Sequence, residues 1–171
     1  TGDGLMGIDF KCTGGVINKS PHSSEPSLAH IQLTNVSDIQ IGFIGAANHA
    51  SYTNNFSDAI YGIKAINSQA TIMNNSFTSI NNPTNSSGNC TYCGSSIYFE
   101  NTDNVARDLI IGGAYNTSSG FEWTEYLKND FNNSKNGILT RGNHVTTIQS
   151  NTFNNIYQGI RCNRNYENII I

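Results

Sequence analysis

Hydrophobic and polar positions along the chain follow a short motif that recurs at nearly regular intervals. The tripeptide Asn-x-Phe occurs four times, and in three copies a Gly-Ile pair follows six and seven residues after the phenylalanine. The four copies are Asn54-Asn55-Phe56, Asn75-Ser76-Phe77, Asn129-Asp130-Phe131 and Asn151-Thr152-Phe153; the three pairs are Gly62-Ile63, Gly137-Ile138 and Gly159-Ile160. Phenylalanines are 21 residues apart in the first pair of copies and 22 in the last. Such a period indicates a solenoid of stacked coils.

Weaker copies extend the repeat over nearly the whole chain. They are Val36 with Gly42-Phe43, Tyr115 with Gly120-Phe121, and the isolated pairs Gly7-Ile8 and Ser96-Ile97. Together they predict about seven coils of ~21–22 residues. Two longer gaps contain proline-bearing segments, near 19–27 and 81–94, which we interpret as loop insertions, because solenoids tolerate insertions in their turns. We expect residues 1–171 to form one such segment of a longer chain.

Alternation within each copy predicts short strands. After each glycine, the next residue and the one two further on should face the core, and the residue between them should face solvent. The second inward positions are Phe10, Gly45, Ala65, Phe99, Trp123, Thr140 and Cys162; the outward positions are Asp9, Ile44, Lys64, Tyr98, Glu122, Leu139 and Arg161. We expect the glycine to need positive φ. The asparagine two before each phenylalanine should stack on its counterparts and bond to the neighbouring turn.

Leucine-rich repeats have a similar period but need several leucines per coil, and this chain has six in all. The hexapeptide pattern of left-handed β-helices is absent. The motif Asn-x-Phe-x5-Gly-Ile resembles the right-handed parallel β-helix repeat of pectate-lyase-like proteins, most closely the Asn-rich type of secreted bacterial proteins, including those of Bacteroidota. The resemblance implies an all-β fold, a right-handed parallel β-helix. It says little about activity, because this architecture carries lyases, hydrolases, epimerases, tailspikes and adhesins.

Composition narrows the function classes. The net charge is −3 with nine basic residues spread along the chain, so we predict no nucleic-acid partner. No apolar run approaches the ~20 residues of a membrane-spanning helix, so we predict no membrane insertion. The 26 asparagines and 12% charged residues argue against a helical bundle.

The outward positions form a lengthwise stripe in which chemistry could lie. For an enzyme of this family the resemblance implies carboxylates, often near calcium, with an Arg or Lys as base. The candidate catalytic residues are Glu100, Glu122, Arg141 and Arg161, and the candidate glycan-binding residues are Lys64 and Tyr98. The alternative is that scattered opposite charges only keep the surface polar. No cluster of three aspartates falls on one face, so we assign no metal and no cofactor and leave only calcium open.

The positions of the cysteines and histidines say less about function than the outward stripe does. Cys90-x-x-Cys93 fits a redox motif, half a zinc site or a local disulfide, and we favour the disulfide, which suits an oxidising compartment. Cys162 falls on an inward position and is predicted to be a buried thiol. The four histidines share no metal-ligand spacing and are predicted to be loop or surface residues.

These patterns favour a secreted or cell-surface β-helix module that acts as a structural or adhesive scaffold. Its partners would be a polysaccharide, a surface protein or neighbouring coils of the same protein. The alternative is a segment of a polysaccharide lyase or glycoside hydrolase, and the sequence leaves open whether the protein is an enzyme. A third hypothesis is that the chain is a spacer without a binding role.

Overall fold

A computed structural model describes residues 16–17, 29–37, 39–42, 53–80, 93–103, 105–112, 128–142, 144–163 and 169–170. These residues form strands and turns, without a helix. The strands are β1 (Val16–Ile17), β2 (Ala29–Thr34), β3 (Ile39–Ile41), β4 (Asn54–Ser57), β5 (Tyr61–Ile66), β6 (Ala70–Ile72), β7 (Asn75–Thr78), β8 (Ser95–Glu100), β9 (Arg107–Gly112), β10 (Asp130–Asn132), β11 (Asn136–Arg141), β12 (His144–Gln149), β13 (Thr152–Asn154), β14 (Gln158–Asn163) and β15 (Ile169–Ile170).

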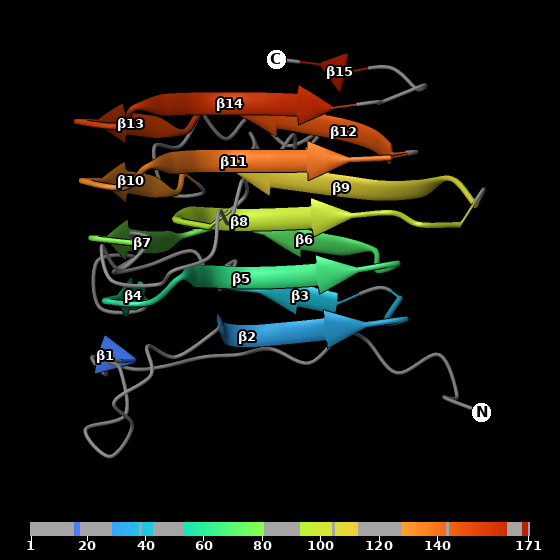
Figure 1. Ribbon diagram of the computed structural model, residues 1–171, viewed down its shortest axis with the longest axis horizontal. Helices are drawn as coiled ribbons and strands as arrows, with labels where there is room; N and C mark the ends of the chain where they lie inside the picture. Colours follow the sequence, from blue (N-terminus) through green and yellow to red (C-terminus); the bar gives the residue numbers. More distant parts are fainter. Residues whose placement is uncertain are drawn as a thin grey trace, which may run out of the picture.

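The strands build three parallel sheets. The first sheet has the order β1-β4-β7-β10-β13, the second β2-β5-β8-β11-β14 and the third β3-β6-β9-β12-β15. Each coil therefore gives one strand to each sheet, and the described strands make five coils. In Figure 1 the second-sheet strands run to the right in front, the third-sheet strands return behind them, and each coil lies above the one before. This winding is right-handed, so the predicted all-β right-handed parallel β-helix is confirmed.

Aromatic stacking forms the centre of the core. Phe56, Phe77, Phe131 and Phe153 lie in register on β4, β7, β10 and β13. Their ring centroids are 4.8, 5.1 and 4.9 Å apart, with interplanar angles of 11°, 5° and 10°. Neighbouring strands lie ~4.7–4.9 Å apart, so backbone pairing itself brings the rings to stacking distance. Phe56, Phe77 and Phe131 are fully buried, which is worth ~1.5–3 kcal/mol for each ring, whereas Phe153 is partly buried. The repeat of Phe is the sequence signature of this column.

The predicted asparagine ladder runs beside the phenylalanine column, at the corner between the third and first sheets. The Nδ2 atom of Asn54 donates to Asn75 Oδ1 at 2.9 Å, Asn75 to Asn129 at 3.0 Å, and Asn129 to Asn151 at 3.0 Å. The Nδ2 of Asn129 also donates to the carbonyl of Ile72 at 3.0 Å. These amides satisfy backbone groups at a corner where strand pairing stops, which confirms the predicted role.

Turn conformation explains further asparagines. Eight described non-glycine residues have φ between 49° and 58°, and five of them are asparagines: Asn35, Asn67, Asn74, Asn133 and Asn155. Asparagine tolerates this left-handed region better than most residues, because its short amide bonds locally to the backbone. The high asparagine content thus has two structural causes, the ladder and the turns.

The prediction that the repeated glycine needs positive φ is wrong. Gly62, Gly137 and Gly159 lie inside strands of the second sheet, and none has positive φ. At two of them the reason is space: a Cβ on Gly62 would lie 2.6 Å from the Phe77 ring, and one on Gly137 would lie 2.6 Å from the Phe153 ring. The glycine therefore leaves room for the phenylalanine of the next coil.

One weak repeat copy is wrong because Gly42 occupies a different corner. Gly42 follows β3 of the third sheet, with φ of 107°. The pairing of Ala29 with Tyr61 and of Ile31 with Ile63 places His30 opposite Gly62 instead. A glycine in a turn and a glycine inside a strand look alike in sequence, which explains the error.

The copy at Tyr115 and Gly120-Phe121 is also wrong as a separate coil. Those residues lie outside the described part, as does Gly7-Ile8, but β8 pairs directly with β11, and β7 with β10, with no strand between. The chain from β9 to β10 therefore connects two neighbouring coils. The expected insertions near 19–27 and 81–94 lie between β1 and β2 and between β7 and β8.

Candidate functional site

The outward stripe lies on the second sheet, where strand register sets its order. Lys64 pairs with Tyr98, Tyr98 with Leu139, and Leu139 with Arg161, so these four residues lie on successive coils. One row further along the strands, Glu100 pairs with Arg141. The predicted inward neighbours Ala65, Phe99 and Thr140 are fully buried, whereas Cys162 on the last described second-sheet strand is only half-buried.

Tyr98 and Leu139 were expected to face solvent, and this expectation is wrong. Tyr98 is 3% exposed and Leu139 is 0% exposed. With Ile60, Tyr61 and Cys93 they form a second apolar cluster, outside the core of the β-helix. The Tyr61 and Tyr98 rings lie 5.4 Å apart, and the Lys64 ammonium lies 5.5 Å from the Tyr61 ring centroid. Stacking of a sugar on Tyr98 would require this cluster to open.

Tyr98, Glu100 and Arg141 come together in one hydrogen-bonded network. The Tyr98 hydroxyl donates to Glu100 Oε2 at 2.8 Å, and Arg141 Nη1 donates to Glu100 Oε1 at 2.8 Å. The Glu100 and Arg141 side chains are 23% and 28% exposed. Both carboxylate oxygens of Glu100 are therefore engaged within the protein. Chemically, the group can fix the end of β8 to the end of β11 through hydrogen bonds to both carboxylate oxygens.

Electrostatics keep Tyr98 in its neutral form. Burial raises the pKa of Tyr98 well above its ordinary value, and the hydrogen bond to Glu100 raises it further, whereas Arg141 lowers it in part. Burial, with a smaller contribution from the Glu100 charge, also raises the pKa of Tyr61. A phenol with a raised pKa is a poor general base near neutral pH, so Tyr98 acts here as a hydrogen-bond donor.

Of the remaining candidate catalytic residues, Arg161 is described and does not join this network. Arg161 Nη1 donates to Gln158 Oε1 at 3.5 Å, at the limit of hydrogen-bond length, and belongs to the coil beyond Leu139. Glu122 lies outside the described residues. The structure thus unites Glu100 with Arg141 and keeps Arg161 on a separate coil.

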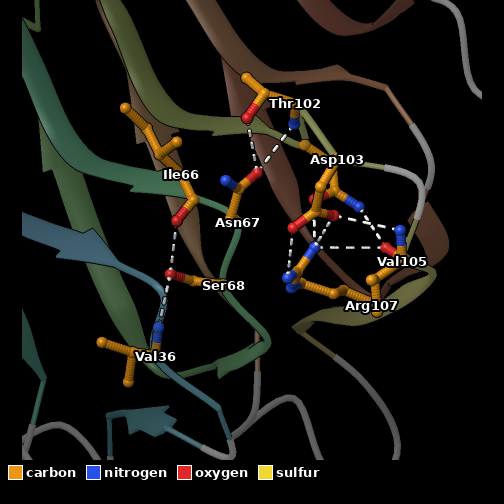
Figure 2. Close-up of polar contacts among 9 residues, drawn as sticks. Val36, Ile66, Asn67, Ser68, Thr102, Asp103, Val105 and Arg107 are labelled. Carbon is orange, nitrogen blue, oxygen red and sulfur yellow. Dashed lines mark hydrogen bonds and ion pairs between the residues drawn. The ribbon is translucent and has the colours of Figure 1, made fainter.

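Sequence reasoning missed a second polar group, at the corner that follows β8 (Figure 2). Arg107 Nη2 donates to Asp103 Oδ2 at 2.8 Å and Arg107 Nη1 to Asp103 Oδ1 at 2.5 Å, a two-pronged ion pair. These bonds hold the pKa of Asp103 below its usual range. Thr102 N donates to Asn67 Oδ1 at 2.8 Å, which joins this corner to the coil before it. An Asp-x3-Arg spacing in a turn region was the available signal.

Cys162 and His30 lie on strands of the second sheet, and Cys93 lies two residues before the second-sheet strand β8. Cys93 is disulfide-bonded, and Cys90, its predicted partner, lies outside the described residues. Cys162 is a free thiol and half-buried, not the buried thiol expected. His30 is not a loop residue: it lies in β2, its Nε2 is 2.7 Å from the carbonyl of Ser57, and its ring is 6.1 Å from that of Phe56.

The described residues hold neither a metal-binding cluster nor a membrane-spanning helix. No three His, Cys, Asp or Glu side chains there are grouped so that they could hold a metal ion. No described helix is long and apolar enough to cross a membrane.

Comparison with known proteins gives no relative for this chain. No protein-family model matches it. Neither a curated protein nor a solved structure matches it.

Proposed function

We propose that this chain is a module of a secreted or cell-surface protein, a stiff structural or adhesive scaffold that holds glycan- or protein-binding groups at its corners. The observation that carries the proposal is the closed network on the second sheet. Both oxygens of Glu100 accept bonds from Tyr98 and Arg141, and Tyr98 is buried, so these side chains brace the coils. Continuous columns through the core give the stiffness that a scaffold needs.

The compartment and the family are part of the same proposal. The disulfide at Cys93 favours an oxidising environment, because thiols in the cytosol are kept reduced. The stacked Asn and Phe columns suit membership of the pectate-lyase-like superfamily, in its Asn-rich bacterial branch. That architecture serves both enzymes and adhesins, so the chemistry of the site has to decide between them.

The test compares turnover with binding in the intact chain. The protein is incubated with a panel of acidic and neutral polysaccharides, and new reducing ends and unsaturated uronate products are measured. Retention on the same immobilised polysaccharides is measured in parallel. The scaffold proposal expects glycan retention without product.

Two variants separate the proposal from the enzyme alternative. Product that is lost in Glu100→Gln but retained in Asp103→Asn would make the chain a segment of a lyase or hydrolase and overturn the proposal. Asp103→Asn is the matched control, since it removes a nearby carboxylate charge outside the stripe. If the chain gives no product and is retained neither on glycans nor on surface proteins, it is a spacer.

A further inference from the structure

The corner between the first and second sheets carries a hollow in the last two described coils. It has a volume of about 440 Å³ and is shallow and open to solvent, so a ligand held there would keep one side exposed. Two equivalent turns line it, residues 133–135 after β10 and residues 155–157 after β13. The lining residues are Asn133, Ser134, Lys135, Asn155, Ile156 and Tyr157.

Backbone bonds hold the two turns against each other. Asn133 N donates to the carbonyl of Asn154 at 3.1 Å, Tyr157 N to that of Ser134 at 3.4 Å, and Gln158 N to that of Lys135 at 3.0 Å. Asn133 and Asn155 have matching φ values of 51° and 52°. The hollow is therefore formed before any ligand arrives, which lowers the entropy lost on binding.

Ser134 and Ile156 form the floor of the hollow. The Ser134 hydroxyl is buried; it donates to the carbonyl of Asn132 at 3.2 Å and accepts from Ile80 N at 3.2 Å. Ile156 is half-buried and packs against the main core. These two residues fix the shape of the hollow and leave recognition to the other side chains.

Three side chains at the rim supply recognition chemistry. The Tyr157 ring is 82% exposed, an unusual position for a large aromatic side chain on a rigid corner. Lys135 is half-buried and belongs to no ion pair of the described structure. Asn155 donates one N–H to Asn133 Oδ1 at 2.6 Å, which orients its amide and leaves its carbonyl oxygen as an acceptor.

We infer that this hollow binds one pyranose ring that carries a carboxylate, at the end or along the side of a glycan. The apolar face of the ring stacks on Tyr157, the carboxylate pairs with Lys135, and ring hydroxyls donate to the Asn155 carbonyl. A neutral ring would leave the ammonium without a partner. This inference rests on the proposed adhesive function and assigns its glycan contact to one corner.

Two kinds of sugar present this chemistry, a sialic acid and a hexuronic acid. Binding of the intact protein is measured by saturation-transfer NMR and calorimetry with sialyllactose, with a glucuronic-acid-terminated disaccharide, and with lactose as the neutral reference. We expect one of the two acidic probes to bind with a Kd of about 1 mM or below, and lactose at least about tenfold more weakly. Which acidic probe binds identifies the source of the carboxylate.

Variants assign the binding to the hollow. Tyr157→Ala should weaken the acidic probe at least about tenfold, and Lys135→Gln about three- to tenfold, with the preference over lactose lost in Lys135→Gln. Lys128→Gln, which removes a charge from the same coil but lies outside the hollow, is the control and should bind as the parent chain does. Since Tyr157 is exposed, its variant should fold, which circular dichroism checks.

Two results would overturn the inference. One is that neither acidic probe binds at millimolar concentration; the other is that binding survives Tyr157→Ala unchanged. If polysaccharide retention persists in Tyr157→Ala while the small probes fail, the site is wrong and the adhesive function stands. If the parent chain turns over a polysaccharide, the proposed function fails whatever happens at this hollow.

Discussion

The space left by the repeated glycine can be tested with a matched pair of substitutions. Gly137 and Gly159 occupy equivalent positions on β11 and β14, one coil apart. A Cβ on Gly137 would lie 2.6 Å from Phe153 Cε1 and 2.6 Å from the carbonyl oxygen of Gly159. A Cβ on Gly159 would lie no closer than 3.7 Å to its nearest neighbour, an ordinary contact. Gly137→Ala and Gly159→Ala therefore make the same chemical change in two different spaces.

The expected magnitudes follow from these distances. Overpacking of a filled core costs ~1–3 kcal/mol, and Gly137→Ala should fall in this range, because one of the two contacting atoms is backbone. Ser96 occupies the equivalent position on β8 and is fully buried, so a coil whose neighbours are arranged around a Cβ atom can hold a side chain at this position. Gly159→Ala meets no clash and restricts the unfolded chain, so we expect no loss of stability and a gain of up to ~1 kcal/mol.

Urea unfolding followed by circular dichroism measures both variants against the parent chain. The transition midpoint should fall for Gly137→Ala and should hold or rise for Gly159→Ala, a separation of ~1–4 kcal/mol in the free energy of unfolding. If both variants lose the same stability, or if Gly159→Ala loses more, then close approach of the next phenylalanine is not why the glycine recurs.

Three further predictions test the ladder, the outer cluster and the thiols. Asn129→Ala should lower the free energy of unfolding by ~2–5 kcal/mol in the same urea assay, because it leaves the buried hydrogen-bonding groups of Asn75, Ile72 and Asn151 without their partner. Asn132→Ala, outside the ladder, is the control and should change it by less than ~0.5 kcal/mol. Equal losses in the two variants would contradict the ladder. Because the pKa of Tyr98 is higher in the folded chain than its value of ~10 in the unfolded chain, the stability that it contributes is complete below pH ~10 and is lost as the pH rises towards the folded pKa. The parent chain should therefore lose stability above pH ~10 more steeply than Tyr98→Phe does. Parallel pH profiles of the two proteins would refute this. Iodoacetamide applied without reductant should label Cys162 and leave Cys93 unlabelled until reduction, as peptide mass spectrometry can check; labelling of native Cys93 would exclude the disulfide.

The fold could be predicted because its strongest determinants repeat in sequence. Phe56, Phe77, Phe131 and Phe153 are each required at the same point of a coil, so their spacing reports the coil length directly. The asparagine ladder repeats for the same reason: each amide needs an identical amide one coil away. Where a residue serves only the backbone of its own turn, as Gly42 does with its φ of 107°, the sequence pattern predicted the wrong register.

The candidate site was less predictable, because outward positions are not constrained by the repeat. Alternation placed Tyr98 correctly on the outer face of β8, but it could not indicate that Tyr61 and Leu139 would bury it there. The pairing of Glu100 with Arg141 depends on β8 lying next to β11, and that adjacency requires the intervening chain to form no coil of its own. Sequence spacing alone gave the opposite interpretation.

The long segments between strands leave and re-enter the coils at their corners, and this has a physical reason. Phe77 and Phe131 are 54 residues apart in sequence, yet their rings stack at 5.1 Å, because strand pairing restores the register after any excursion of the chain. A corner can therefore accept new residues without a cost to the core, whereas a strand cannot accept even one without turning its inward side chains outward. The Asp103–Arg107 pair and the hollow beside Tyr157 both lie at corners. Substitutions at corner positions outside the asparagine ladder should consequently change binding with little effect on folding, and substitutions along the strands should do the reverse.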